Sequence, residues 1–167
     1  MNTYTYPLPE FEQKIIAPEN LLAHIAQLPR PLVFTNGCFD ILHRGHVTYL
    51  AQARALGASL IVALNTDESV KQQGKGDDRP INTLANRAAL IAALQDVDCV
   101  TWFNSDTPAQ LIEMVLPDIL VKGGDWSITN IVGAEETLSR GGQVHAIPFE
   151  HTTSTTQTIA QIRQSIK

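Results

Sequence analysis

Cysteine is scarce in this chain of 167 residues, and long apolar runs are missing. The two cysteines, Cys38 and Cys99, lie far apart, form no CxxC pair and have no metal-like spacing with histidine, which favours a reducing compartment. The first residues, MNTYTYPLPEFEQK, lack a basic start followed by an apolar stretch, and no run approaches the roughly 18 apolar residues of a membrane span. We therefore expect a cytoplasmic protein that is neither secreted nor inserted in a membrane.

Positive charge is also in short supply, since 12 lysines and arginines stand against 17 aspartates and glutamates and give a net charge of -5. This balance argues against binding nucleic-acid backbone or anionic lipid through overall charge, so any phosphate site must be a local cluster. The Walker A pattern GxxxxGK[ST] and the GxGxxG fingerprint are both absent, which removes the main support for a kinase-type NTPase or an NAD dehydrogenase. With 44% hydrophobic residues, the chain can still bury the core of one domain.

Short apolar strands alternate with helical patterns from residue 31 onward. We predict strands at 32–34, 60–64, 99–103, 119–121 and 144–147, and helices at 47–56, 83–95, about 108–116, before Gly141 and after Ser154. Ser105 or Asp106 is the expected cap of the helix near 108, and residues 72–80 are expected to form a loop. The alternation predicts an α/β fold with a Rossmann-like, doubly wound parallel sheet of about five strands, order 3-2-1-4-5, and helices on both faces.

Residues 1–30 are predicted to form an N-terminal arm with a short helix, and residues 31–167 to form the main domain. Ligands of such sheets bind outside the carboxyl ends of the strands, where the winding reverses. The unusual segments fall at these ends: TNGCFDILHRGH, NTDE, KGGDW and EHTTSTT. His43 and His46 flank Arg44-Gly45 at a predicted helix start, where free backbone N–H groups favour an anion. From spacing alone a phosphate site, ordinary helix caps and metal ligands all remain open.

The stretch TNGCFDILHRGH resembles the signature of the HxGH nucleotidyltransferase superfamily, and the likeness continues through LNTDESV, KGDDRPIN, QDVDCV, LVKGGDW and STT over roughly residues 31–166. Within that superfamily the segments look most like the adenylyltransferases that make ADP-heptose from ATP and D-glycero-β-D-manno-heptose 1-phosphate. The resemblance implies direct attack of the sugar phosphate on the α-phosphate of ATP, with Mg²⁺ held mostly by phosphates and water. It makes 31–167 a nucleotidyltransferase domain. It also implies a separate heptose kinase as functional partner.

The resemblance also assigns roles to individual residues. His43, His46 and Lys75 would be catalytic. The residues implied for nucleotide binding are Thr35, Asn36, Gly37, Cys38, Phe39, Arg87, Lys122, Gly123, Gly124, Asp125, Trp126, Ser154 and Thr155. Those implied for substrate binding are Asp40, Asn65, Asp67, Lys75 and Arg79.

Each of these assignments has a plainer alternative. Lys75 and Arg79 could belong to a solvated surface loop, and Arg87 could be a surface charge. Residues 122–126 could be a βα turn with a packed Trp126, and Ser154 a simple helix cap. Asp40 and Asp67 could support the loops or contribute to a magnesium shell. His24, His145 and His151 are treated as structural.

Phe149-Glu150 stands where cytidylyltransferase members of the superfamily carry an arginine before the final Ser/Thr motif, which agrees better with the heptose type. A cytidylyltransferase acting on glycerol 3-phosphate or another alcohol phosphate is the main alternative, and a non-catalytic nucleotide-binding module is the second. The segment LQDVDCVTWF resembles the interface region of related cytidylyltransferases, so a homodimer is expected.

Overall fold

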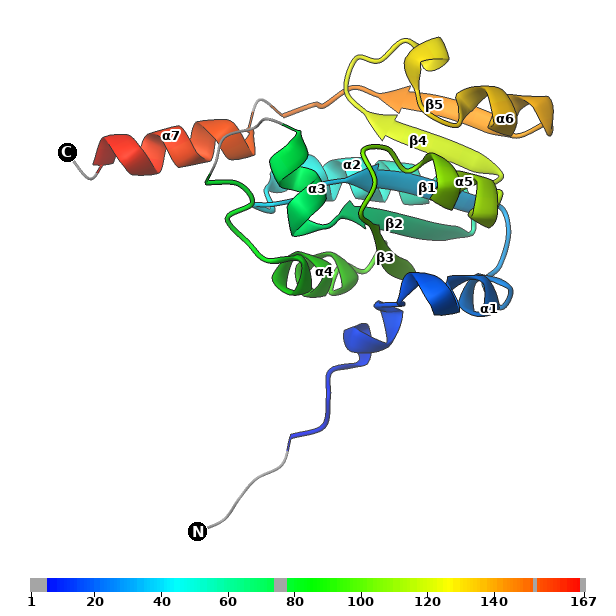
Figure 1. Ribbon diagram of the computed structural model, residues 1–167, viewed down its shortest axis with the longest axis horizontal. Coiled ribbons are helices and arrows are strands. Elements are labelled where there is room, and N and C mark those ends of the chain that lie inside the picture. Colours follow the sequence, from blue (N-terminus) through cyan, green and yellow to red (C-terminus); the bar gives the residue numbers. More distant parts are fainter. Residues whose placement is uncertain (1–5, 74–77, 152, 166–167) are drawn as a thin grey trace.

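The computed structural model describes residues 6–73, 78–151 and 153–165, and within these ranges five strands form one sheet (Figure 1). The strands are β1 (Leu32–Gly37), β2 (Ser59–Asn65), β3 (Cys99–Phe103), β4 (Ile119–Gly123) and β5 (Gln143–Ile147). Their order is β3-β2-β1-β4-β5, and all four pairings are parallel. The predicted Rossmann-like order is confirmed, with the winding reversing between β1 and β4.

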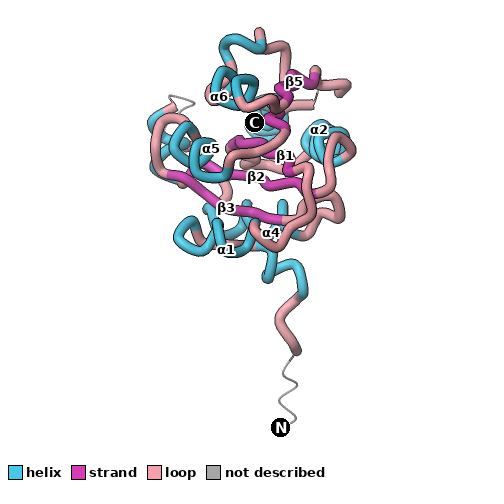
Figure 2. The backbone as a smooth tube through the Cα atoms, turned by 90° about the vertical axis from the view of Figure 1, so that its right-hand side faces the viewer, coloured by secondary structure: helices cyan, strands magenta, loops and turns pink. Residues whose placement is uncertain are grey.

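Helices cover both faces of this sheet (Figure 2). The α-helices are α1 (Leu21–Ile25), α2 (Arg44–Arg54), α3 (Asp67–Gln72), α4 (Leu84–Ala92), α5 (Ala109–Val115), α6 (Ala134–Ser139) and α7 (Thr155–Ser165). Short 3-10 turns occur at η1 (Glu10–Lys14), η2 (Pro18–Asn20) and η3 (Ile128–Asn130). None of the helices in the described ranges has the length and apolarity needed to cross a bilayer.

The core has two halves because side chains of successive strand residues point to opposite faces. All seven residues of β2 are buried. Its Ile61 and Ala63 pack with α1, α5 and α6, whereas Leu60, Val62 and Leu64 pack with α2 and α4. The strand β2 is apolar on both faces, as expected at the centre of a parallel sheet. Its side chains therefore pack against the helices on both faces of the sheet.

Some local expectations were wrong. The helix after β1 begins at Arg44 and not at Val47, so it includes Gly45 and His46 in its first turn. Ser105 and Asp106 do not cap α5, whose N-cap is Pro108 without a side-chain bond; the Ser105 hydroxyl instead donates to Thr107 O at 2.7 Å.

The short helix α3 was not predicted. It forms because Thr66 caps it, with the Thr66 hydroxyl accepting from the backbone N–H of Ser69.

The N-terminal residues lie along the edge strand β3. Ile15 forms an isolated parallel bridge with Val100, and the Ile16 N–H donates to Val100 O at 2.8 Å. Leu21 and Ile25 of α1 are buried in the core. Residues 6–9 extend from the body (Figure 1). The domain boundary at residue 30 stays a prediction.

Candidate active site

The loop after β1 and the first turn of α2 bring the two motif histidines to the carboxyl edge of the sheet. His43 is the N-cap residue of α2 with an extended backbone, and its carbonyl accepts from the N–H groups of His46 at 2.9 Å and Val47 at 3.2 Å. No side-chain oxygen caps this helix end, because the motif has imidazoles where Ser or Asp usually stands. The N-terminal end of α2 is thus left to attract an anion, as the helix dipole favours.

The two imidazoles stack on each other. Their ring centroids lie 3.7 Å apart at an interplanar angle of 18°, and Phe39 meets His46 edge-on with centroids 5.0 Å apart. Phe39 holds this position with a positive φ of 46°, which is uncommon for an aromatic residue. A Cβ on residue 45 would lie 3.1 Å from the His43 ring. The absence of a side chain at Gly45 therefore leaves space for this ring.

Both rings are uncharged at neutral pH. Burial lowers the pKa of His43. Burial also lowers the pKa of His46 to about 4, assisted by the neighbouring His43 and partly opposed by a bond to the backbone of Ile41. The Nδ1 atoms of both rings are buried and have no hydrogen-bond partner among the described residues. A buried polar atom without a partner is energetically costly, so a hydrogen bond to either Nδ1 atom would stabilise the pair.

A cavity of ≈ 170 Å³ lies beside the reversal point. It is lined from β1 by Asn36, from β2 by Asn65, from β4 by Lys122 and from the segment after β4 by Trp126. The Lys122 ammonium donates to Asn36 Oδ1 at 3.4 Å and lies 6.0 Å from the Trp126 ring centroid. Trp126 is half exposed and Asp125 is exposed, so the alternative of a packed tryptophan is wrong. Neither motif histidine is among the residues that line this cavity.

The Ser/Thr segment before α7 lies next to the histidine loop. The Thr155 hydroxyl donates to Ile41 O at 3.3 Å, and a Cβ on Gly45 would lie 3.8 Å from Thr153 O. Ser154 caps α7, accepting from the backbone N–H of Gln157 at 3.2 Å. The predicted cap is confirmed, and two segments more than 100 residues apart in sequence meet at this edge.

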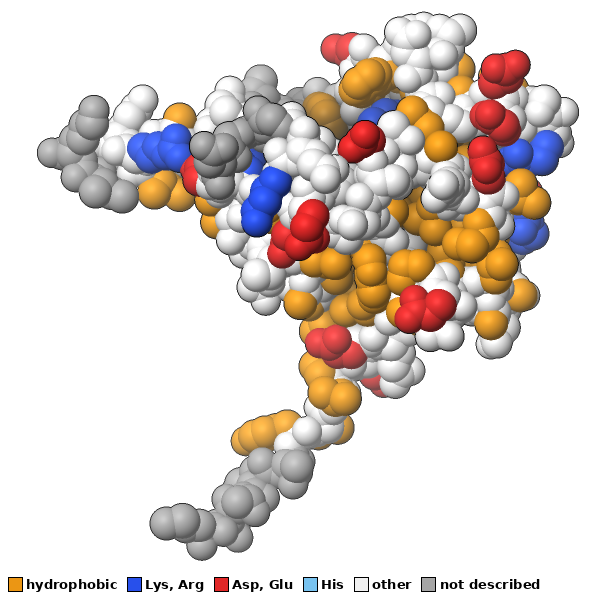
Figure 3. Space-filling model, viewed as in Figure 1, with side chains coloured by type: hydrophobic (Ala, Val, Ile, Leu, Met, Phe, Trp, Pro, Cys, Tyr) orange, Lys and Arg blue, Asp and Glu red, His pale blue; other side chains and the backbone are white. Residues whose placement is uncertain are grey.

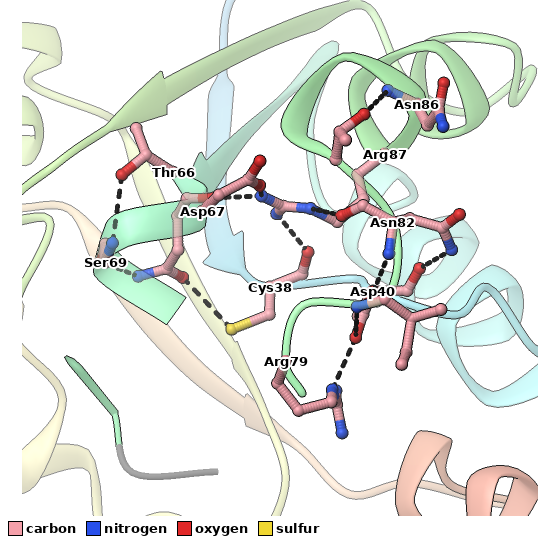
Figure 4. A network of polar contacts seen from close by, with 12 residues as sticks. Cys38, Asp40, Thr66, Asp67, Ser69, Arg79, Asn82, Asn86 and Arg87 are labelled. Carbon is pink, nitrogen blue, oxygen red and sulfur yellow. Dashed lines mark hydrogen bonds and ion pairs between the residues drawn. The ribbon is translucent and has the colours of Figure 1, made fainter. Parts of the chain in front are cut away.

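Arg87 lies inside the protein, so its interpretation as a surface charge is wrong (Figure 4). From α4 its guanidinium donates to three backbone carbonyls, those of Cys38 at 2.8 Å, Asn65 at 2.8 Å and Asn82 at 3.1 Å. It also pairs with the Asp67 carboxylate at 2.8 Å. These bonds tie the end of β2, the β1 loop and the segment before α4 together. In this structure Arg87 holds loops and does not face the cavity.

Asp40 anchors the segment that leads into α4. Its carboxylate accepts from Arg79 Nε at 2.6 Å and from the backbone N–H groups of Ile81 at 3.0 Å and Asn82 at 2.8 Å. Burial by itself raises the pKa of Asp40, but the two backbone N–H groups and the Arg79 guanidinium outweigh burial and lower the pKa below its usual value. Of the two predicted roles, loop support is the one that these contacts bear out.

Three further predicted site residues are Cys38, Asn65 and Lys75. The Cys38 thiol lies 3.2 Å from Gln73 Oε1, and Asn65 Nδ2 donates to Ser69 Oγ at 2.9 Å. Lys75 lies outside the described residues. Sequence reasoning missed Gln73, Tyr49 and Phe149. Tyr49 follows His46 by three residues on α2, a spacing that places both side chains on one helix face and was the available signal.

An all-parallel sheet whose winding reverses between β1 and β4, with a stacked histidine pair at the helix start after β1, defines a Rossmann-like α/β protein. The chain belongs to the cytidylyltransferase-like family, whose sequence profile matches residues 34–160. The resemblance to nucleotidyltransferases is thereby confirmed.

Individual relatives agree with this assignment. The chain is 56% identical over 156 residues to the D-beta-D-heptose 1-phosphate adenylyltransferase of Bordetella bronchiseptica, covering 92% of this chain and 96% of that protein. It is 53% identical over 154 residues to the bifunctional protein HldE of Nitrosococcus oceani, covering 90% of this chain and 32% of that protein. The chain therefore spans about a third of the length of that bifunctional relative.

Solved structures share the fold. The lipopolysaccharide core biosynthesis protein of Thermoplasma volcanium superposes with a TM-score of 0.58 at 30% identity, covering 73% of this chain and 98% of that one. Pantothenate synthetase of Thermus thermophilus superposes with a TM-score of 0.57 at 16% identity, covering 81% and 61%, and this likeness shows the fold alone.

Proposed function

We propose that this protein transfers the adenylyl group of ATP to D-glycero-β-D-manno-heptose 1-phosphate, giving ADP-heptose and pyrophosphate. The observation that carries the proposal is the stacked, uncharged histidine pair with its unpartnered Nδ1 atoms at the start of α2. The substrate is inferred from the Bordetella relative, which aligns over 92% of this chain and bears the name of this activity. Base and sugar choice rest on that similarity.

The reaction needs charge stabilisation and alignment but no protein nucleophile. A phosphate oxygen of the sugar phosphate attacks the α-phosphorus of ATP, a P–O bond forms in line, and the bond to the β-phosphate breaks to release pyrophosphate. His43 and His46 donate hydrogen bonds to the phosphate oxygens as charge builds on them. A bound phosphate raises the pKa of both rings, because a negative charge nearby favours the protonated form.

Other predicted residues divide the work around this centre. The β1 loop (36–39), the β4 segment (122–126) and Ser154 and Thr155 would surround the nucleotide, with Trp126 and Lys122 beside its base or ribose. Lys75 and Arg79 would bind phosphate groups from the loop before α4. The roles of Asp40, Asp67 and Arg87 are indirect, because their charged groups hold those loops in place.

We expect Mg²⁺ to enter as part of the MgATP substrate. The described residues contain no group of three or more His, Cys, Asp or Glu side chains arranged for a metal ion, and the Asp40 carboxylate is taken up by three donors. Phosphate oxygens and water are the ligands that Mg²⁺ prefers, so the nucleotide can carry the ion itself.

The test is an assay of the purified protein with ATP or CTP, heptose 1-phosphate or glycerol 3-phosphate, and pyrophosphatase to draw the reaction forward. We expect product with ATP and heptose 1-phosphate. Activity with CTP and glycerol 3-phosphate alone would reject the heptose assignment, and nucleotide binding without turnover on any pair would indicate a non-catalytic module.

Two histidine variants link that activity to the site. His46→Ala should lower kcat by about 10²-fold or more, the scale observed when a transition-state donor is removed. His145→Ala is the control, because that ring lies on β5 and bonds to Gln143 instead of the site. Equal kcat in both variants would refute the role of His46.

We also propose that the protein is a cytoplasmic homodimer. Its sugar 1-phosphate substrate would be supplied by a separate kinase that phosphorylates the anomeric hydroxyl. The dimer proposal rests on the edge strand β3, near which apolar side chains gather on the surface (Figure 3). A hollow of ≈ 640 Å³ there is lined in part by Trp102, Leu111 and Met114. Light scattering that gives a monomer mass at micromolar concentration would remove the dimer proposal.

A further inference from the structure

Tyr49 is a buried tyrosine on the same helix as the histidine pair, one turn after His46. Its side chain is only 3% exposed. Its hydroxyl lies 2.5 Å from Thr35 Oγ1 on β1, and it also bonds to the backbone of Gly123 at the end of β4. A single phenol oxygen therefore joins α2 to the two strands between which the winding of the sheet reverses.

The Tyr49 ring makes a third connection, to the segment after β5. Phe149 meets it edge-on, with ring centroids 5.8 Å apart at an angle of 69°. A Cβ on Gly123 would lie 2.7 Å from Phe149 Cζ and 3.2 Å from Tyr49 Cε2, so only glycine allows the β4 strand to approach both rings this closely. The contacts of Tyr49 thus reach β1, β4 and the segment following β5.

Each of these three contacts lies in or near a segment proposed to surround the nucleotide. Thr35 directly precedes residues 36–39, Gly123 belongs to the β4 segment 122–126, and Phe149 precedes the Ser154 cap by five residues. His46 lies one turn before Tyr49 on α2, and His43 is the N-cap residue of the same helix. The positions of both rings depend on the placement of α2, which the Tyr49 hydroxyl joins to β1.

We propose that Tyr49 is a positioning residue that sets the histidine pair at the distance from the β1 loop and the β4 segment that adenylyl transfer requires. This inference rests on the proposed function. Tyr49 acts through α2 and takes no part in the chemistry, since its hydroxyl is buried between Thr35 and Gly123. Misplacement of reacting groups by about 1 Å can cost about 10²-fold in rate, so a small shift of this helix is sufficient.

The test removes one oxygen atom and keeps the ring. In Tyr49→Phe the contact with Phe149 remains, while the Thr35 hydroxyl loses its partner. We expect kcat to fall by about 10-fold or more. A Thr35→Val, Tyr49→Phe double variant should fall no further than Tyr49→Phe alone, because Tyr49→Phe already deletes the bond to Thr35 together with the bond to the Gly123 backbone.

The matched control is Thr137→Val. The Thr137 side chain is fully buried on α6 and donates to Gly133 O at 2.7 Å, so the control also deletes a buried hydroxyl hydrogen bond, but away from the site. All assays are run at a temperature where circular dichroism shows each variant folded. If Tyr49→Phe keeps kcat within about 2-fold of the parent, as Thr137→Val should, the role of Tyr49 is structural only and the proposal fails.

A second readout needs no turnover and separates this proposal from the proposed function. The ring ¹⁵N and ¹³C resonances of His43 and His46 should shift in Tyr49→Phe and stay in place in Thr137→Val. If the parent protein has no adenylyltransferase activity but the resonances still shift in Tyr49→Phe, the proposed reaction is rejected. In that case Tyr49 remains the residue that positions the histidine pair. Unshifted resonances would overturn the positioning role whatever the activity.

Discussion

Arg87→Lys tests whether the buried guanidinium holds the loops of the site together. The substitution keeps the positive charge but replaces a planar group of five donors by a single ammonium. Arg87 reaches Asn65 O and the Asp67 carboxylate through Nη2, Cys38 O through Nη1 and Asn82 O through Nε. These acceptors lie on different segments of the chain, so a lysine at this position can bond to one or two of them and leaves the others without a donor.

The expected cost follows from the bonds lost. Two hydrogen bonds from a charged donor contribute about 1.5 kcal/mol each at the lower end of the usual range, so the variant should lose about 3 kcal/mol of unfolding free energy. For a chain of this size that corresponds to a fall of about 6–12 °C in Tm. Because the loops released include the β1 loop, kcat should fall as well.

Urea unfolding followed by circular dichroism measures the free energy, and an unchanged m value would show that the native state itself was destabilised. Arg54→Lys is the control. Arg54 also pairs with an aspartate, Asp98 at 2.8 Å, and donates to a backbone carbonyl, but 32% of its side chain is exposed. Exposed pairs contribute about 1 kcal/mol or less. A Tm for Arg87→Lys within about 2 °C of that of Arg54→Lys would refute the reasoning.

Three further predictions concern pH, the Asp40 anchor and the β4 turn. The pKa of His46 is about 4 in the folded protein against 6.5 in the unfolded chain, so the unfolded state binds the proton first. The free energy of unfolding should therefore fall by up to about 3 kcal/mol as the pH drops from 6.5 to 4. His46→Asn should flatten that slope in urea titrations at each pH. The pKa of Asp40 is lowered on folding, so its contribution is present above about pH 3.8 and lost below it, and Asp40→Asn should cost about 2 kcal/mol at pH 7 in the same assay, with no loss contradicting the anchor. Gly123→Ala places a Cβ 2.7 Å from Phe149 Cζ and should raise the KM for ATP several-fold in steady-state kinetics, whereas an unchanged KM would show that the β4 segment does not bind nucleotide.

Many features of the site follow from local sequence. Buried strands that alternate with helices leave few arrangements for a chain of this length, so the strand order was predictable from periodicity and handedness. The histidines could be placed at a helix start because they follow an apolar strand and come just before a helical pattern. Ser154 could be placed as a cap for a similar local reason, and the structure bears it out.

Other features depend on partners distant in sequence. Arg87 looks like an ordinary exposed charge on an amphipathic helix, and only the convergence of three carbonyls from separate loops makes it a buried group. The helix α3 was missed because its residues, DESVKQ, have no strong apolar period and its cap, Thr66, also reads as part of a loop. Tyr49 was passed over because a tyrosine inside a helix pattern usually indicates core packing and nothing more.

The amino-acid sequence by itself determined the order of the sheet and the edge at which the chemistry gathers, because side-chain periodicity and chain handedness act over a few neighbouring residues. Only the tertiary structure decided which polar groups face that edge and which lie behind it and hold the surrounding segments together. Arg87, Asp40 and Tyr49 have this second role because folding brought backbone carbonyls, N–H groups and a hydroxyl from remote segments within hydrogen-bonding distance. A buried polar group must find such partners, and no local pattern specifies where they come from.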